Sequence, residues 1–188
     1  MTDIMYKLLL LLVTLTMTIT SSGQTSKETD FAKKIVDVFK SKNLDNYKQL
    51  TPTKADVEEL YNDKGVIRGL GVDNDEKYKK ALETYEKSAD SNYRAQFNRL
   101  LKKGDKLGID WTQITFLKFV FHKDKPKNSD KTFLSGHVNF KYKETVYVLF
   151  GLEAMCIKGD YKINMIRTVQ KGGVGQYVDP DLLDDDDL

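Results

Sequence analysis

The spacing of apolar residues divides the chain into a helical half and a strand half. Up to Gly104, apolar side chains recur every three or four residues, which is the period of amphipathic helices. This pattern predicts a first helix that begins after a capping box at Thr25 and Glu28 and ends near Lys42. It also predicts a long helix over residues 75–103, which Gly104 ends.

Two short helices are predicted between these longer ones. The first holds Leu44 and Tyr47, and the second is capped by Thr53. Core packing, favoured over a cofactor site, explains the aromatic residues of the long helix. The side chains predicted to face inward are Val57, Leu60 and Tyr61 on the second short helix, and Tyr78, Leu82, Tyr85, Ala89, Phe97, Leu100 and Leu101 on the long one.

After Trp111 the chain becomes rich in Val, Ile, Phe, Tyr and Thr, which favours strands. Four strands are predicted, and the tight connections between the last three favour an antiparallel meander. The third strand is apolar at both parities, which predicts cover on both of its faces. The predicted strands are 112–121, 133–142, 145–157 and 161–169; in the third, Val146, Val148, Phe150 and Leu152 should face one way and Tyr147, Leu149, Met155 and Ile157 the other.

Composition is that of a folded protein, because 40% of the 188 residues are hydrophobic and 31% are charged. The single cysteine, Cys156, excludes an intrachain disulfide. Residues 24–178 hold 29 basic and 21 acidic residues, a formal net charge of +8. Most of the basic residues are lysines scattered along the chain, without the arginine clusters of a nucleic-acid site. We therefore expect no nucleic-acid partner.

The two ends of the chain differ from its middle. Residues 1–23 combine Lys7, a 12-residue apolar stretch and small residues at 21–23, which is typical of a signal peptide. An uncleaved anchor or a buried helix is the alternative. Residues 179–188 hold six aspartates and predict a disordered tail. We therefore expect one domain over residues 24–178, secreted or periplasmic, with no membrane span once the signal is cleaved.

The element order resembles that of the NTF2-like superfamily, the cystatin-like α+β cone, as an exported bacterial member. Helices come first, and a strongly curved four-stranded antiparallel meander ends the domain over residues 25–170. The resemblance implies an α+β fold whose sheet wraps round the helices and leaves a pocket at its wide end. It does not imply one activity, because the family includes isomerases, dehydratases and binding domains without catalysis.

The candidate pocket residues are polar or adaptable side chains within apolar strands. A carboxylate and a hydrogen-bond donor inside such a cone resemble the site of ketosteroid isomerase. A buried or rim ion pair, with a solvent-facing histidine, is the alternative interpretation. The proposed ligand-binding set is His137, Glu153, Arg167, Tyr147 and Met155.

No catalytic residue, metal site or cofactor is predicted, because the chain has two histidines and no distinctive acid pair. We expect a small-molecule-binding or protein-interaction domain, with a small apolar ligand or a cell-envelope protein as its partner and a homodimer left open. The alternative is an isomerase-, dehydratase- or hydrolase-like enzyme that uses a buried carboxylate.

Overall fold

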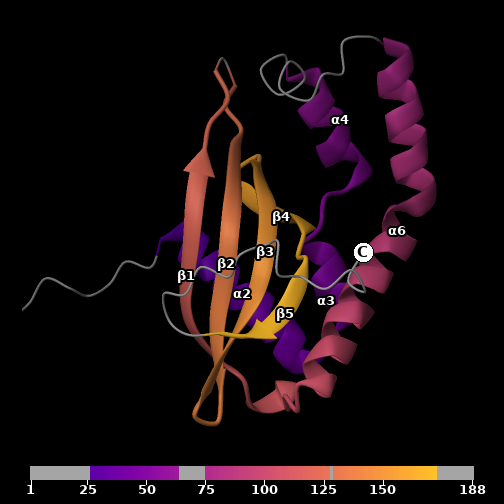
Figure 1. Cartoon of the computed structure of the whole chain (residues 1–188). Coiled ribbons are helices and arrows are strands. Elements are labelled where there is room, and N and C mark those ends of the chain that lie inside the picture. The colour runs from indigo at the N-terminus through magenta and orange to yellow at the C-terminus, as the bar shows by residue number, and fades with distance from the viewer. Residues whose placement is uncertain (1–25, 64–74, 128, 173–188) are drawn as a thin grey trace, which may run out of the picture.

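The computed structural model of the chain describes residues 26–63, 75–127 and 129–172, except for the side chains of residues 75, 77, 78 and 81. The predicted signal peptide and acidic tail lie outside these ranges. Within them the chain is α+β, with helices packed on a curved antiparallel sheet that is not closed into a barrel (Figure 1). This confirms the predicted fold class.

The helices of the described ranges follow the predicted order. Thr53 caps the third of them in a capping box, in which the Asp56 carboxylate accepts the Thr53 backbone N–H at 2.8 Å. This satisfies backbone donors that the first turn of a helix leaves free. The helices are α2 (Lys27–Ser41), α3 (Leu44–Gln49), α4 (Lys54–Asn62) and α6 (Asp75–Lys106).

The predicted capping box of α2 is wrong. Ser26 is the N-cap, and its Oγ accepts the Thr29 backbone N–H at 3.2 Å. Glu28 makes tertiary contacts instead: its Oε1 lies 2.7 Å from Lys123 Nζ and accepts the Tyr161 hydroxyl at 2.8 Å. These two hydrogen bonds lower the pKa of Glu28 to about 2. The carboxylate therefore ties the start of α2 to two strands.

The long helix passes the predicted stop at Gly104 and ends at Lys106, just before a left-handed glycine. Gly108 has a φ of 74°, and the Ile109 N–H donates to the Gly104 carbonyl at 3.0 Å, which is the Schellman pattern. Position 104 requires a glycine for another reason, because a Cβ there would lie 2.0 Å from Cζ2 of Trp111. The glycine thus lets an indole ring pack against the helix backbone.

The strands form one antiparallel sheet in the order β1-β2-β3-β4, and β5 also pairs with β3. The predicted last strand is therefore split in two at Ile166 and Arg167. The short η1 (Trp111–Gln113) leads into the sheet. The strands are β1 (Thr115–Asp124), β2 (Thr132–Tyr142), β3 (Thr145–Ile157), β4 (Asp160–Met165) and β5 (Thr168–Lys171).

A bulge in β3 changes which side chains share a face. Gly136 pairs with Leu152 and Val138 with Leu149, so two residues of β3 lie opposite the single His137. One of them is Gly151, whose φ is 65°. The predicted parity is therefore wrong beyond the bulge. Tyr147 and Leu149 share the main core with Leu152 and Ala154, while Met155 and Ile157 pack with Leu60 and Phe133.

The two faces of the sheet meet different helices. On the first face α2 packs over the core, and α6 runs alongside β5 (Figure 1). The core there is a chain of rings whose neighbouring centroids lie between 4.9 and 5.9 Å apart. On the other face α4 approaches the end of β3. The rings are Tyr47, Phe97, Phe39, Trp111, Phe140 and Tyr147.

Candidate functional site

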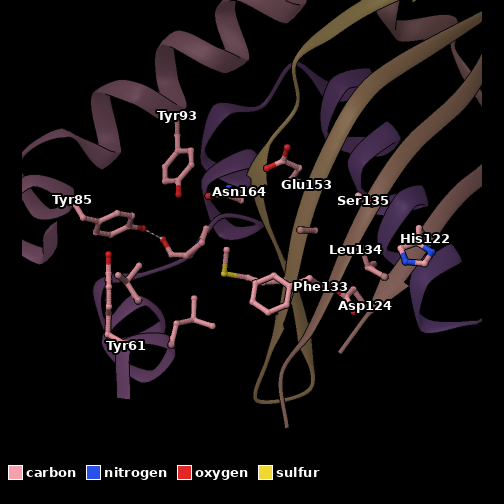
Figure 2. A pocket seen from close by; sticks show the side chains of 15 residues that line it. Tyr61, Tyr85, Tyr93, His122, Asp124, Phe133, Leu134, Ser135, Glu153 and Asn164 are labelled. Carbon is pink, nitrogen blue, oxygen red and sulfur yellow. Dashed lines mark hydrogen bonds between the residues drawn. The ribbon is translucent and has the colours of Figure 1, made fainter. Parts of the chain in front are cut away.

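A pocket of about 550 Å³ opens between α4, α6 and the upper part of the sheet. Figure 2 shows that its walls come from opposite sides: tyrosines of the two helices on one side and side chains of β1 and β2 on the other. Glu153 and Asn164 lie between these walls. The lining residues are Pro52, Val57, Leu60, Tyr61, Tyr85, Tyr93, His122, Asp124, Phe133, Leu134, Ser135, Glu153, Ala154, Met155 and Asn164.

The helical wall is aromatic and held in place by hydrogen bonding. Tyr85 of α6 donates its hydroxyl proton to the backbone carbonyl of Pro52, just before α4. Burial raises the pKa of Tyr85, and it raises that of Tyr93 further, with the neighbouring Tyr85 hydroxyl as a second cause. Both phenols are therefore neutral at physiological pH and present ring surface and a hydroxyl to the pocket.

The sheet wall carries a row of polar side chains, which the antiparallel register places next to one another. His122 of β1 pairs with Ser135 of β2, and Ser135 pairs with Glu153 of β3. Directly opposite residues on one face have Cβ atoms about 5 Å apart. The next row runs from Asp124 through Phe133 to Met155. One row is thus entirely polar, and the other joins a carboxylate to an aromatic ring and a thioether.

Glu153 is oriented by an ion pair. Nη2 of Arg167 lies 3.1 Å from its Oε1, with the two side chains 39% and 50% exposed for Glu153 and Arg167 respectively. The aliphatic part of Arg167 passes over Gly151, where a Cβ would lie 2.6 Å from Cγ of the arginine. Such a half-exposed pair adds less than about 1 kcal/mol to stability, so its main effect is to fix the carboxylate at the pocket.

A second arginine fixes the backbone behind this pair. Arg99 of α6 donates from Nη2 to the Ile166 carbonyl at 3.2 Å and from Nη1 to the Arg167 carbonyl. These carbonyls lie where β4 gives way to β5, and they would otherwise lack a partner in the ladder. The Arg167 N–H donates to the Phe150 carbonyl at 3.0 Å. The strand break is therefore held from both sides.

Ion pairs attach α4 to the sheet at the far end of the pocket. Glu59 of α4 accepts from Lys131 and, at 2.9 Å, from Lys158. Both hydrogen bonds lower the pKa of Glu59. Ser129 Oγ donates to Asp63 at 2.7 Å. These contacts hold the helix that carries Leu60 and the aromatic Tyr61 against the sheet.

The structure brings together three of the five predicted pocket residues. Glu153 and Met155 line the pocket, and Arg167 binds Glu153. His137 lies in the next row of the same sheet face, where its ring stacks on Phe150 at 6.3 Å, and it does not line the pocket. Burial, with a smaller effect of a nearby lysine, lowers its pKa. Tyr147 lies elsewhere, 7% exposed in the core.

Sequence reasoning missed the tyrosine wall. The sequence predicts Tyr61 and Tyr85 as inward-facing side chains of the core, not of a pocket. Tyr93 is not among the predicted inward-facing residues. The signal that was present is the spacing of Tyr85 and Tyr93, eight residues apart and so on one face of the helix. His122 and Ser135 could not be paired without the register of β1 and β2.

Comparisons with protein-family models, with curated proteins and with solved structures find no match to this chain. The resemblance to the NTF2-like superfamily therefore stays a prediction. Within the ranges that the structure describes, no group of three or more His, Cys, Asp or Glu side chains is arranged to hold a metal ion. No helix in those ranges combines the length and the apolar character that crossing a bilayer requires.

Proposed function

We propose that this chain binds a small molecule with an apolar body in the pocket between α4, α6 and the sheet. The observation that carries the proposal is the pocket itself. Its volume of about 550 Å³ falls in the range of small-molecule sites, and most of its lining is aromatic or aliphatic with a few polar groups. Action outside the cytoplasm and membership of the NTF2-like superfamily belong to the same proposal.

Binding is favoured over catalysis by the state of Glu153. An isomerase-like enzyme needs a carboxylate that is unpaired and removed from water, so that its proton affinity is raised. Glu153 is paired with Arg167 at 3.1 Å and its side chain is 39% exposed. That environment suits a fixed hydrogen-bond acceptor better than a general base.

A neutral apolar dye, Nile red, tests the proposal with a pair of matched variants. Ser135→Trp fills the pocket from an exposed position of β2, whereas Thr115→Trp places the same ring at an exposed position of β1 away from it. We expect saturable dye emission with the unmodified chain, at least tenfold weaker binding to Ser135→Trp, and unchanged binding to Thr115→Trp. Dye binding that Ser135→Trp does not weaken would contradict the proposal.

Edge strand β1 favours a second function, self-association. Of the four large apolar side chains that the described residues leave exposed, three belong to β1: Leu117, Val120 and Phe121. Among the described residues the strand pairs with β2 alone, so its other edge has no described partner strand, and a second copy of β1 can satisfy the backbone groups there. Sedimentation equilibrium should show a concentration-dependent dimer that Val120→Lys abolishes and Leu107→Lys, at a similarly exposed site just after α6, does not. A monomer at all concentrations would exclude this function.

A further inference from the structure

We propose that the ligand of this pocket is an organic amine, with its apolar body against the helical wall and its ammonium group bound at Glu153. The inference rests on the proposed function, because it names the chemical class of a ligand at the same site. Its basis is the contrast between the aromatic wall of α4 and α6 and the charge carried by the sheet wall.

The charged groups that line the pocket favour a cation. Asp124 and Glu153 are acidic, and none of the fifteen described residues that line the pocket is a lysine or an arginine. This contrasts with the whole chain, in which Lys and Arg number 30 against 28 acidic residues. Among the described lining residues, a carboxylate ligand would meet two carboxylates and, as the basic side chain, the imidazole of His122, with no lysine or arginine to bind it, which disfavours anion binding.

Basic side chains around the pocket are engaged by other groups. Lys131 and Lys158 bind Glu59, and Lys162 Nζ donates to the Gln49 carbonyl at 3.0 Å. Arg167 contacts a pocket carboxylate directly and binds Oε1 of Glu153. An anionic ligand would have to share one of these cations with the group that already binds it.

Glu153 retains an acceptor for the ligand. Its Oε2 has no hydrogen-bond partner among the residues that the structure describes. In Figure 2 its side chain lies on the same side of β3 as Tyr93, and Ser135 is its direct neighbour across the strand pair. An ammonium group there can donate to Oε2 and to the Ser135 hydroxyl. Charge-assisted hydrogen bonds of this kind are stronger than neutral ones.

The aromatic wall matches the apolar body of such an amine. Tyr61, Tyr85 and Tyr93 are grouped on the helical side of the pocket. Their rings offer a broad apolar surface against which an aryl or alkyl body packs, while the ammonium group lies at Glu153. An amine with an arylalkyl body satisfies both walls, which neither a sugar nor a nucleotide does.

Three probes with one body and different heads test the inference by calorimetric titration of the full chain. They are 4-phenylbutylamine, 4-phenyl-1-butanol and 4-phenylbutyrate. We expect the amine to bind about fivefold more tightly than the alcohol and at least tenfold more tightly than the carboxylate. Equal affinities, or tightest binding of the carboxylate, would overturn the amine inference and leave the pocket proposal standing. Absence of binding for all three would overturn both.

A charge-removing variant locates the head group. Glu153→Gln should weaken binding of the amine about fivefold and change binding of the alcohol less than twofold. The matched control is Glu144→Gln, because Glu144 is a 96% exposed side chain in an ion pair with Lys141 outside the pocket. Unchanged amine affinity in Glu153→Gln, with folding verified by circular dichroism, would overturn the assignment of the ammonium site.

Discussion

Arg167 reaches Glu153 only because residue 151 has no side chain. A Cβ on Gly151 would lie 2.6 Å from Cγ and 2.7 Å from Cδ of Arg167, too close for the arginine stem to pass. With glycine there, Nη2 of Arg167 lies 3.1 Å from Oε1 of Glu153. The bulge at Gly151 and the strand break at Arg167 are therefore two parts of one arrangement, which sets a carboxylate at the pocket.

Replacing Gly151 tests this arrangement. Gly151→Ala adds a clash with Arg167 to the strain of an alanine at a φ of 65°, so we expect a loss of about 2–3 kcal/mol in the free energy of unfolding. Urea denaturation measures it. Gly159→Ala is the matched control, since Gly159 has a φ of 87° and nothing within 4 Å of an added Cβ. It should lose about 1 kcal/mol, and equal losses for both variants would contradict the close approach.

Arg99 binds the backbone at the strand break and Arg94 does not, although both belong to α6. Replacing Arg99 should therefore lower the free energy of unfolding more than replacing Arg94. Arg99→Met leaves the carbonyls of Ile166 and Arg167 without their donor, and we expect a loss of about 1–2 kcal/mol. Arg94→Met removes an exposed pair with Asp90 and should cost less than about 0.5 kcal/mol. Thermal unfolding of the two variants gives the comparison, and similar melting temperatures would argue against a role for Arg99 in holding β4 and β5.

Gly104 should reverse the usual effect of alanine in a helix. An alanine in a helix interior normally gains up to about 1 kcal/mol over glycine. Here its Cβ would lie 2.0 Å from the Trp111 ring, so Gly104→Ala should instead destabilise the chain by about 1–3 kcal/mol. Trp111 fluorescence during urea unfolding reports both the stability and the ring environment. A stabilised Gly104→Ala variant would show that the indole does not pack on the helix as described.

Glu28 predicts a pH dependence of stability. Its pKa in the folded chain is lowered from 4.5 to about 2, so the carboxylate adds stability above its unfolded pKa, and this stability is lost as the pH falls from about 4.5 to about 2. Glu28→Gln should therefore be less stable by about 1–2 kcal/mol at pH 7 and equal to the unmodified chain near pH 2.

An exposed acid of α6 provides the control for this pH series. Glu83→Gln should differ little from the unmodified chain at any pH, because Glu83 is exposed and away from the Lys123 and Tyr161 contacts. Chemical denaturation at a series of pH values gives both curves. A Glu28→Gln deficit that is the same at pH 2 and pH 7 would show that the lost contribution is not that of an ionised carboxylate.

Local chemistry explains why much of the fold could be predicted. The N-cap at Thr53 and the tight turns between β2, β3 and β4 are short-range signals, and α4 and these turns form where they indicate. Two of the errors arise at glycines that could have more than one role. Gly104 has the sequence position of a helix stop, but its role is set by Trp111, and the Gly151 bulge inverts the parity of the rest of β3.

The pocket depended on contacts that no local pattern contains. Glu153 is predicted as a pocket residue because a titratable side chain stands in an apolar strand, and it lines the pocket, as does the predicted Met155. Tyr147 stands in the same strand, but it lies before the bulge and packs in the core. The tyrosines of α4 and α6 join the site through the packing of two helices, whose relative position the sequence does not specify.

The most direct measurement is an NMR titration of the full chain, labelled at its methionine methyl groups, with the neutral probe 4-phenyl-1-butanol. Met155 lines the pocket, whereas Met165 does not. Met165 lies on β4, where it pairs with Glu153 of β3. We predict a saturable shift of the Met155 methyl signal, with Overhauser contacts to the phenyl protons of the probe, and little change at Met165. Saturable binding that leaves the Met155 signal unmoved, or no saturable binding, would contradict the account of this pocket as a ligand site.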